Sequence, residues 1–173
     1  MNNIYENLKE ELKYRPVYTI GLIEMFVYTV MIVYIFIWTP LLLNSNSNTN
    51  FSMTFLCFTF SIIIFSKLFE IQILIGNLEF YDNFSIILLI NCFFLLIPYY
   101  FDDFNIKLIS FTIVNGTFGY LMPALSAFKS KLLNEKYRTL LMSVYKVPTY
   151  LLSIISLIFS IFISIEKVRF FNI

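Results

Sequence analysis

Long apolar runs separated by short polar stretches dominate the amino-acid sequence. An α-helix needs about 20 predominantly apolar residues to cross a bilayer, and five runs come near or exceed that length. The second run has a possible continuation to residue 75, past two charged residues. The runs cover residues 17–43, 51–65, 84–101, 106–128 and 140–165. The pattern predicts an all-α membrane protein with five transmembrane helices.

The polar stretches contain residues that end helices and form turns. Trp38-Thr39-Pro40 combines an interfacial aromatic residue with a helix breaker, so we expect the first helix to end there. The Asn- and Ser-rich segment 44–50 suits a loop outside the bilayer, and Asp102-Asp103 predicts a tight turn. These boundaries divide the chain into a cytoplasmic amphipathic tail at 1–16, a five-helix transmembrane domain at 17–165 and a short tail at 166–173.

The composition agrees with this prediction and argues against several function classes. Hydrophobic residues make up 59% of the chain, charged residues make up 13%, and the mean hydropathy is +0.79, so the lipid bilayer is the expected surrounding. A net charge of +1 without a basic stripe argues against a nucleic-acid partner. The chain contains no His, and Cys57 and Cys92 stand alone in apolar runs. We therefore expect no metal site, no cofactor and no enzymatic activity.

Lys and Arg are distributed unevenly between alternate connections, and the positive-inside rule uses this asymmetry to orient a membrane protein. One side carries the basic residues of the N-terminal tail, Lys67 and the basic stretch 129–138. The other side carries Lys107, Lys167 and Arg169. The larger group predicts a cytoplasmic N-terminus and a C-terminus on the opposite face. We expect an integral, multi-pass protein, with the plasma membrane favoured over an organelle membrane.

Two charged side chains lie inside the predicted helices, Glu24 in the first and Lys146 in the fifth. At a rise of about 1.5 Å per residue, each sits roughly 9–10 Å below the cytoplasmic surface, so the two could form an ion pair. Charges at membrane depth usually face a wet interior, and a carboxylate beside a cation suits proton-coupled binding of an anion. A purely structural ion pair, or a lysine that reaches back to the headgroups, explains the same pattern.

Two polar side chains extend this candidate site. Tyr28 lies one helical turn beyond Glu24 on the same helix face, where its hydroxyl would be a donor to a cavity. Asn115 lies near the middle of the fourth helix, and its amide either bonds a neighbouring helix or faces a substrate. The candidate substrate-binding residues are therefore Lys146, Tyr28, Asn115 and Glu24, and we predict no catalytic residue.

Residue size and charge predict how two of the helices pack. Gly116, Gly119 and Ala124 on the fourth helix permit close contact with a neighbouring helix. The third helix contains neither a charged residue nor a glycine. We therefore expect the third helix to lie outside against lipid, with Phe93 and Leu95 exposed.

Several blocks of residues occur in an order that resembles a known transporter family. Ile-Gly-Leu-Ile-Glu at 20–24 and Phe-Ile-Trp-Thr-Pro at 36–40 resemble the seventh helix of the molybdate-anion transporter family in the major facilitator superfamily. Gly119-Tyr120, the basic stretch 129–138 and Tyr-Lys-Val-Pro at 145–148 resemble the tenth helix, the following loop and the start of the eleventh helix. The spacing between these blocks is also similar.

The resemblance implies both a fold and a function. The five helices would correspond to helices seven to eleven of a twelve-helix transporter, forming a partial C-terminal half-bundle without helices one to six and twelve. The chain would be a fragment or a reduced form of a secondary transporter for an oxyanion such as molybdate. Lys146, Tyr28 and Asn115 would hold the anion, with Glu24 as a proton-coupling group. A separate N-terminal half or a second copy would be a partner, since such transporters enclose substrate between two halves.

The chain departs from the family pattern at these same positions. Glu24 stands where the family has a glutamine, Tyr28 and Asn115 stand where it has acidic residues, and Lys146 stands where it has an arginine. These departures keep a second hypothesis open. In that hypothesis the chain is a non-transporting, multi-pass membrane protein with a structural or assembly role.

Overall fold

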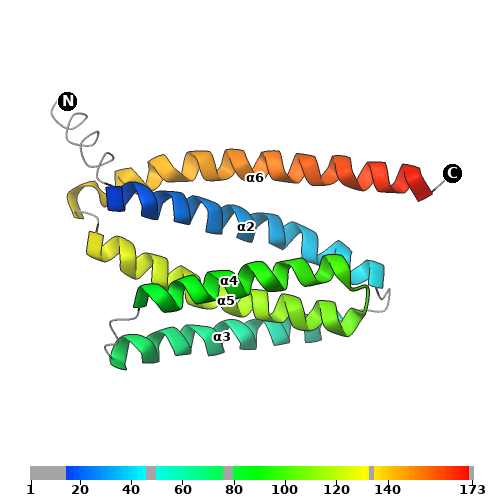
Figure 1. Ribbon diagram of the computed structural model, residues 1–173, viewed down its shortest axis with the longest axis horizontal. Coiled ribbons are helices and arrows are strands. Elements are labelled where there is room, and N and C mark those ends of the chain that lie inside the picture. The colour runs from blue at the N-terminus through cyan, green and yellow to red at the C-terminus, as the bar shows by residue number, and fades with distance from the viewer. Residues whose placement is uncertain (1–14, 46–49, 76–79, 133–134, 172–173) are drawn as a thin grey trace. The chain divides into compact units, whose positions relative to one another are not determined.

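The computed structural model describes residues 15–45, 50–75, 80–132 and 135–171, and all regular structure in these ranges is helical (Figure 1). The predicted tail at 1–16 lies almost entirely outside the described residues, as does most of the Asn- and Ser-rich segment. The helices are α2 (Arg15–Ser45), α3 (Phe51–Ile75), α4 (Phe80–Tyr100), α5 (Phe104–Leu132) and α6 (Glu135–Phe171).

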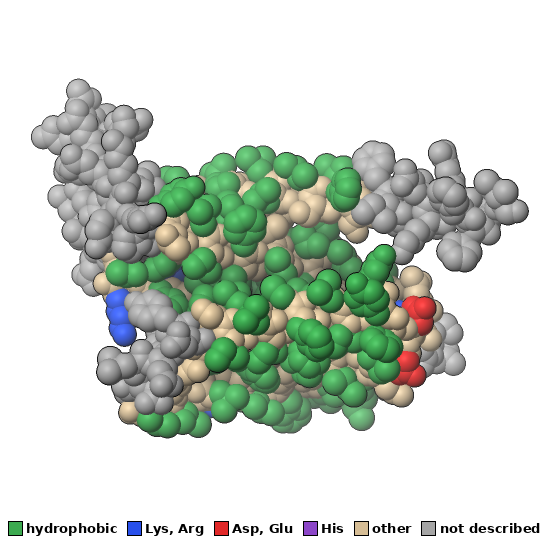
Figure 2. Space-filling view, viewed as in Figure 1, with side chains coloured by type: hydrophobic (Ala, Val, Ile, Leu, Met, Phe, Trp, Pro, Cys, Tyr) green, Lys and Arg blue, Asp and Glu red, His purple; other side chains and the backbone are tan. Residues whose placement is uncertain are grey.

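Within the described ranges, five helices are long and apolar enough to cross a membrane, which confirms the five predicted spans. Their outer faces expose large side chains such as Phe60, Leu89 and Phe93, and hydrophobic side chains cover most of the face seen in Figure 2. Because water opposes such exposure, these helices indicate a membrane-embedded protein. The apolar segments are Val17–Ser45, Phe51–Ile75, Asn83–Tyr100, Phe104–Leu132 and Met142–Ser160.

Two helices continue beyond the ends that the sequence predicts. The expectation that the first helix ends at Pro40 is wrong, since α2 runs through this proline to Ser45. Membrane helices tolerate an internal proline when nearby groups satisfy the backbone that it frees. α5 continues past Phe128 to Leu132, so Lys129 belongs to a helix and not to the predicted basic loop. This second difference decides the partner of a buried carboxylate, described below.

α3 and α6 also extend beyond the shortest spans that the sequence predicts for them. α3 reaches Ile75, which settles the continuation that the sequence leaves open. Lys67 and Glu70 are tolerated there because they form an exposed ion pair of 2.5 Å, one turn apart on the same helix. α6 extends to Phe171, and its helix therefore includes part of the segment 166–173 that the sequence assigns to a tail.

Two compact units make up the chain, and each is described by itself. The first unit comprises Met1–Phe36 together with Phe128–Ile173, and the second comprises Ile37–Ala127. α2 contributes its first part to the first unit and its remainder to the second. α5 contributes its last turn to the first unit, where α6 also lies, and α3 and α4 belong to the second.

In the second unit, α3 and α5 approach closely where α5 carries glycine. A Cβ atom on Gly119 would lie 2.6 Å from the backbone oxygen of Ile62, and one on Gly116 would overlap Ser61. Ser61 and Ser66 on α3 donate hydrogen bonds of 2.7 and 2.8 Å to backbone carbonyls of α5. The predicted close contact is confirmed for both glycines. α5 also supplies buried apolar residues, which include Phe111, Val114, Phe118, Leu121 and Ala124.

One face of α4 packs on α5, and the opposite face is exposed. Asn91 is buried and donates a 2.5 Å hydrogen bond to Thr117, because an amide without a partner is costly in an apolar surrounding. Ser110 on α5 donates to a backbone carbonyl of α4 at 2.5 Å. Phe93 is 62% exposed, as predicted, whereas Leu95 is half-buried. The predicted exposure is therefore confirmed for Phe93 and not for Leu95.

An aromatic cluster joins α2 to α3 within the second unit. The buried indole of Trp38 meets Phe51, Phe55 and Phe58 edge to face, with centroid distances of 6.2, 5.4 and 5.2 Å. Such pairs add to the free energy of apolar burial. Trp38 therefore packs between α2 and α3.

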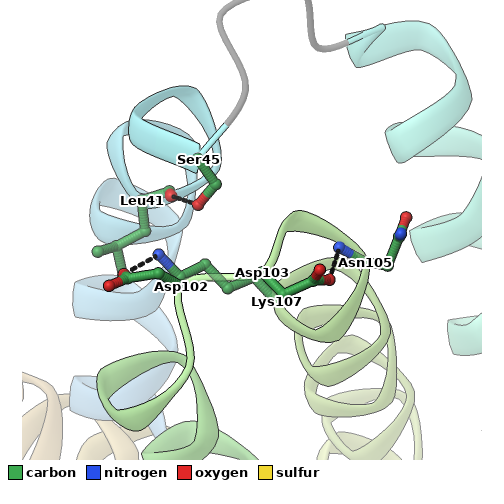
Figure 3. A network of polar contacts seen from close by, with 6 residues as sticks. All are labelled: Leu41, Ser45, Asp102, Asp103, Asn105 and Lys107. Carbon is green, nitrogen blue, oxygen red and sulfur yellow. Dashed lines mark hydrogen bonds and ion pairs between the residues drawn. The ribbon is translucent and has the colours of Figure 1, made fainter.

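The turn between α4 and α5 carries the polar network drawn in Figure 3. The side chain of Asp103 accepts hydrogen bonds from the backbone N–H groups of Asn105 (2.8 Å) and Ile106 (3.1 Å), and it thereby caps the start of α5. Lys107 donates to Asp102 at 3.1 Å, although the lysine side chain is only 4% exposed. The tight turn predicted at Asp102-Asp103 is confirmed, and its two carboxylates have separate partners.

We expect Gly119→Val to lower the thermal unfolding midpoint of the protein in detergent. The added side chain needs space that the backbone of Ile62 occupies, and overpacking of this kind costs about 1–3 kcal/mol. Ser126→Val places the same side chain at an exposed position of α5 and serves as the control. Equal midpoints for the two variants would contradict the close α3–α5 contact.

Candidate functional site

A cavity of about 370 Å³ lies between α2 and α6 in the first unit. Both helices present one face to it, since residues three or four apart on a helix share a face. Both helices form from long apolar runs, and several polar side chains of these runs lie on the faces that line the cavity. The lining residues are Glu24, Tyr28, Met31 and Ile32 of α2 and Tyr145, Lys146, Thr149 and Tyr150 of α6.

The structure brings three of the four candidate residues to this cavity. Glu24, Tyr28 and Lys146 all line it. Asn115 belongs to α5 in the second unit, and its amide donates a 2.9 Å hydrogen bond to the carbonyl of Phe111 on its own helix. Sequence position fixes how deep Asn115 lies along its helix, but it does not fix which group the amide bonds.

The carboxylate of Glu24 forms an ion pair with Lys129 and not with the expected Lys146. The Lys129 ammonium donates to Glu24 Oε1 at 2.7 Å, and each of the two side chains is 9% exposed. The cause is the extra turn of α5, which carries Lys129 to α2. Sequence reasoning missed this residue because it assigned the first lysine after an apolar run to a loop. The signal available in the sequence was that Lys129 directly follows the apolar residue Phe128.

Lys146 lines the cavity and has no carboxylate partner among the described residues. None of the ion pairs among the described residues includes it, and its side chain is exposed. Glu24 lines the same cavity, but its charge is compensated by Lys129. The hydroxyl-bearing residues Tyr28 and Tyr150 are also in the lining. A cation with neighbouring hydroxyl groups is chemically suited to hold an anion.

The ring of Tyr145 on α6 packs against Gly21 on α2. A Cβ atom at Gly21 would overlap the tyrosine ring, so only glycine admits the ring at this place. The hydroxyl of Tyr145 is buried and has no hydrogen-bond partner among the described residues. Tyr145 also lines a small void of about 10 Å³ beside Glu24 and Lys129, which is close to the space that one water molecule needs.

Tyr145→Phe should leave the unfolding midpoint unchanged or raise it. Removing a buried hydroxyl that has no partner takes away a desolvation penalty of about 1–3 kcal/mol and no protein hydrogen bond. Gly21→Ala should lower the midpoint, because its methyl group collides with the same ring. Thermal unfolding of both variants in detergent checks this pair of expectations. A marked loss of stability in Tyr145→Phe would show that the hydroxyl is bonded in the folded protein.

The described residues contain no group of three or more His, Cys, Asp or Glu side chains that could hold a metal ion. Cys57 and Cys92 are free and exposed on α3 and α4. Among the side chains that line the α2–α6 cavity are carboxylate, ammonium and hydroxyl groups.

Comparisons with protein-family models, with curated proteins and with solved structures give no match to this chain. Over the described residues, the fold and the site define the class: five helices that are long and apolar enough to cross a membrane, with a cavity between two of them that both polar and apolar side chains line.

Proposed function

We propose that the protein binds a small anion in the α2–α6 cavity and acts as part of a secondary transporter that moves an oxyanion such as molybdate across a membrane. The observation that carries this proposal is the charge of the cavity. Lys146 lines it and has no carboxylate partner among the described residues, while the charge of Glu24 is compensated by Lys129. Charged side chains at membrane depth are costly and usually mark a substrate or ion pathway.

The size and the remaining lining of the cavity also support an anion. A volume of about 370 Å³ lies within the range of small-molecule sites and admits one oxyanion with part of its hydration shell. The phenol groups of Tyr28 and Tyr150 can each donate a hydrogen bond to anionic oxygen. The apolar residues Met31 and Ile32 are also part of the lining.

The resemblance to molybdate-anion transporters supports the assignment of the five spans to helices seven to eleven of a major facilitator fold. In that assignment the α2–α6 cavity would face a second half of the transporter. A separate N-terminal half or a second copy of the chain would supply it, because alternating access needs two halves that move against each other.

Anion binding by the purified protein in lipid nanodiscs tests the proposal. Radiolabelled sulfate and molybdate should bind in a saturable manner, and Met31→Trp should weaken binding about tenfold by filling the cavity. Phe26→Trp adds the same ring at an exposed position of α2 and should bind as the unchanged protein does. Uptake into proteoliposomes, with and without an N-terminal half, then tests transport.

A structural or assembly role is the second candidate, and the second unit supplies the observation that favours it. Three polar side chains there, Ser61, Ser66 and Asn91, make hydrogen bonds between helices. Such bonds hold membrane helices together without any ligand. A folded protein that binds no anion in nanodiscs would favour this role over transport.

A further inference from the structure

We infer that the cavity accepts a singly charged anion when Glu24 is ionised, and a doubly charged anion only together with a proton on Glu24. This inference rests on the proposed anion-binding function and specifies the charge class of its substrate.

The charges of the described site residues give the first step. Glu24 contributes one negative charge and its partner Lys129 one positive charge, and the two lie 2.7 Å apart. Lys146 contributes a second positive charge, which no carboxylate among the described residues compensates. The sum is one positive charge, so a singly charged anion makes the site neutral.

A doubly charged anion leaves one negative charge uncompensated in the same site. Such a charge is strongly disfavoured at membrane depth. A proton from bulk water that binds a carboxylate oxygen of Glu24 removes the deficit, because the Lys129 ammonium then loses its counter-ion. Two cations would then balance the two charges of the anion. The proton and the anion therefore favour each other's binding, and this coupling is reciprocal.

The position of Glu24 suits this exchange. It lines the large cavity together with Lys146 and the small void together with Lys129, so Glu24 is the residue that the two spaces share. Its hydrogen bond to Lys129 is the one that protonation would weaken. The titratable and charged groups around the carboxylate are Tyr28 on α2, Lys129 on α5, and Tyr145, Lys146 and Tyr150 on α6.

Binding of nitrate and sulfate to the protein in nanodiscs, measured between about pH 8 and pH 5.5, tests the inference, since ordinary lysines and tyrosines do not titrate in that range. Sulfate affinity should rise as the pH falls, by up to about tenfold per pH unit where one proton is taken up. Nitrate should bind throughout with a much smaller change. Equal pH dependence for the two anions, or a sulfate affinity that does not change with pH, would overturn the inference.

Two variants isolate the role of the carboxylate. Glu24→Gln is neutral at every pH, so its sulfate affinity should be high and independent of pH. If that variant does not fold, Glu24→Gln combined with Lys129→Met removes both charges and leaves the single charge of Lys146. The double variant should bind nitrate and bind sulfate weakly at every pH. Sulfate binding that still strengthens at low pH in either variant would assign the proton to another group.

The same measurements separate this inference from the proposed function. Nitrate binding that disappears in Lys146→Ala would support the cavity as an anion site, even if sulfate showed no pH dependence and the inference failed. Failure of both anions to bind the folded protein at any pH would overturn the inference and the proposed function together.

Discussion

Lys146→Ala should weaken anion binding by about 10–100-fold, the factor expected for losing a hydrogen bond to a charged group, and should abolish measurable uptake in an assembly that transports. Lys146 supplies the uncompensated positive charge of the cavity. Without it, the described site residues sum to zero charge and no longer attract an anion. Equilibrium binding of labelled sulfate or nitrate in nanodiscs gives the affinity, and proteoliposome uptake gives the transport rate.

Two control variants separate this role from a general effect of positive charge. Lys67→Ala removes a lysine that is exposed on α3 and paired with Glu70, so it should leave binding unchanged. Lys146→Arg keeps the charge and adds a planar donor fork, so binding should persist. Unchanged affinity in Lys146→Ala would mean that this lysine only reaches toward the headgroups, and the structural hypothesis would then be the better one.

The membrane spans could be predicted from the sequence because their length is set by the bilayer. A helix satisfies its own backbone hydrogen bonds within one segment, so an apolar run of sufficient length specifies a span without information about its neighbours. A close helix contact at Gly116 and Gly119 was also predictable, since the two glycines lie one turn apart and leave room for a neighbouring backbone, although the sequence did not identify α3 as the partner. These features depend on residues that are close together in the sequence.

The ion pair of the site depends on residues that are far apart in the sequence, and it was not predictable. Glu24 and Lys146 lie at similar distances from the start of their predicted spans, and both line one cavity. These distances do not show that α5 continues for one more turn and places Lys129 nearer to the carboxylate. Helix ends are set by tertiary contacts as much as by local sequence.

Pro40 and Trp38 illustrate the same division between local and tertiary causes. A proline and an interfacial aromatic residue are good local signals for the end of a membrane helix. In the folded chain, Trp38 is buried against the phenylalanines of α3, and α2 extends past Pro40 to Ser45. Packing between α2 and α3 therefore overrides the local preference, and only the structure reveals the partner helix.

Breaking the Glu24–Lys129 pair from one side should have the largest effect on stability. Glu24→Gln leaves the Lys129 ammonium buried without its counter-ion, and Lys129→Met leaves the carboxylate in the same condition. Both side chains are 9% exposed, and removing one partner of a buried pair costs about 3–5 kcal/mol. We expect each single variant to lower the free energy of unfolding in detergent micelles by an amount of this order.

The double variant Glu24→Gln with Lys129→Met should recover most of that loss, because it removes both buried charges and leaves none uncompensated. The exposed pair Lys67–Glu70 provides a matched control with the same chemistry at 2.5 Å. Lys67→Met should change the free energy of unfolding by no more than about 1 kcal/mol. Chemical unfolding of all four variants measures the coupling between Glu24 and Lys129 directly. If the two single losses simply added in the double variant, the coupling free energy between Glu24 and Lys129 would be zero. The buried ion pair would then not stabilise the first unit.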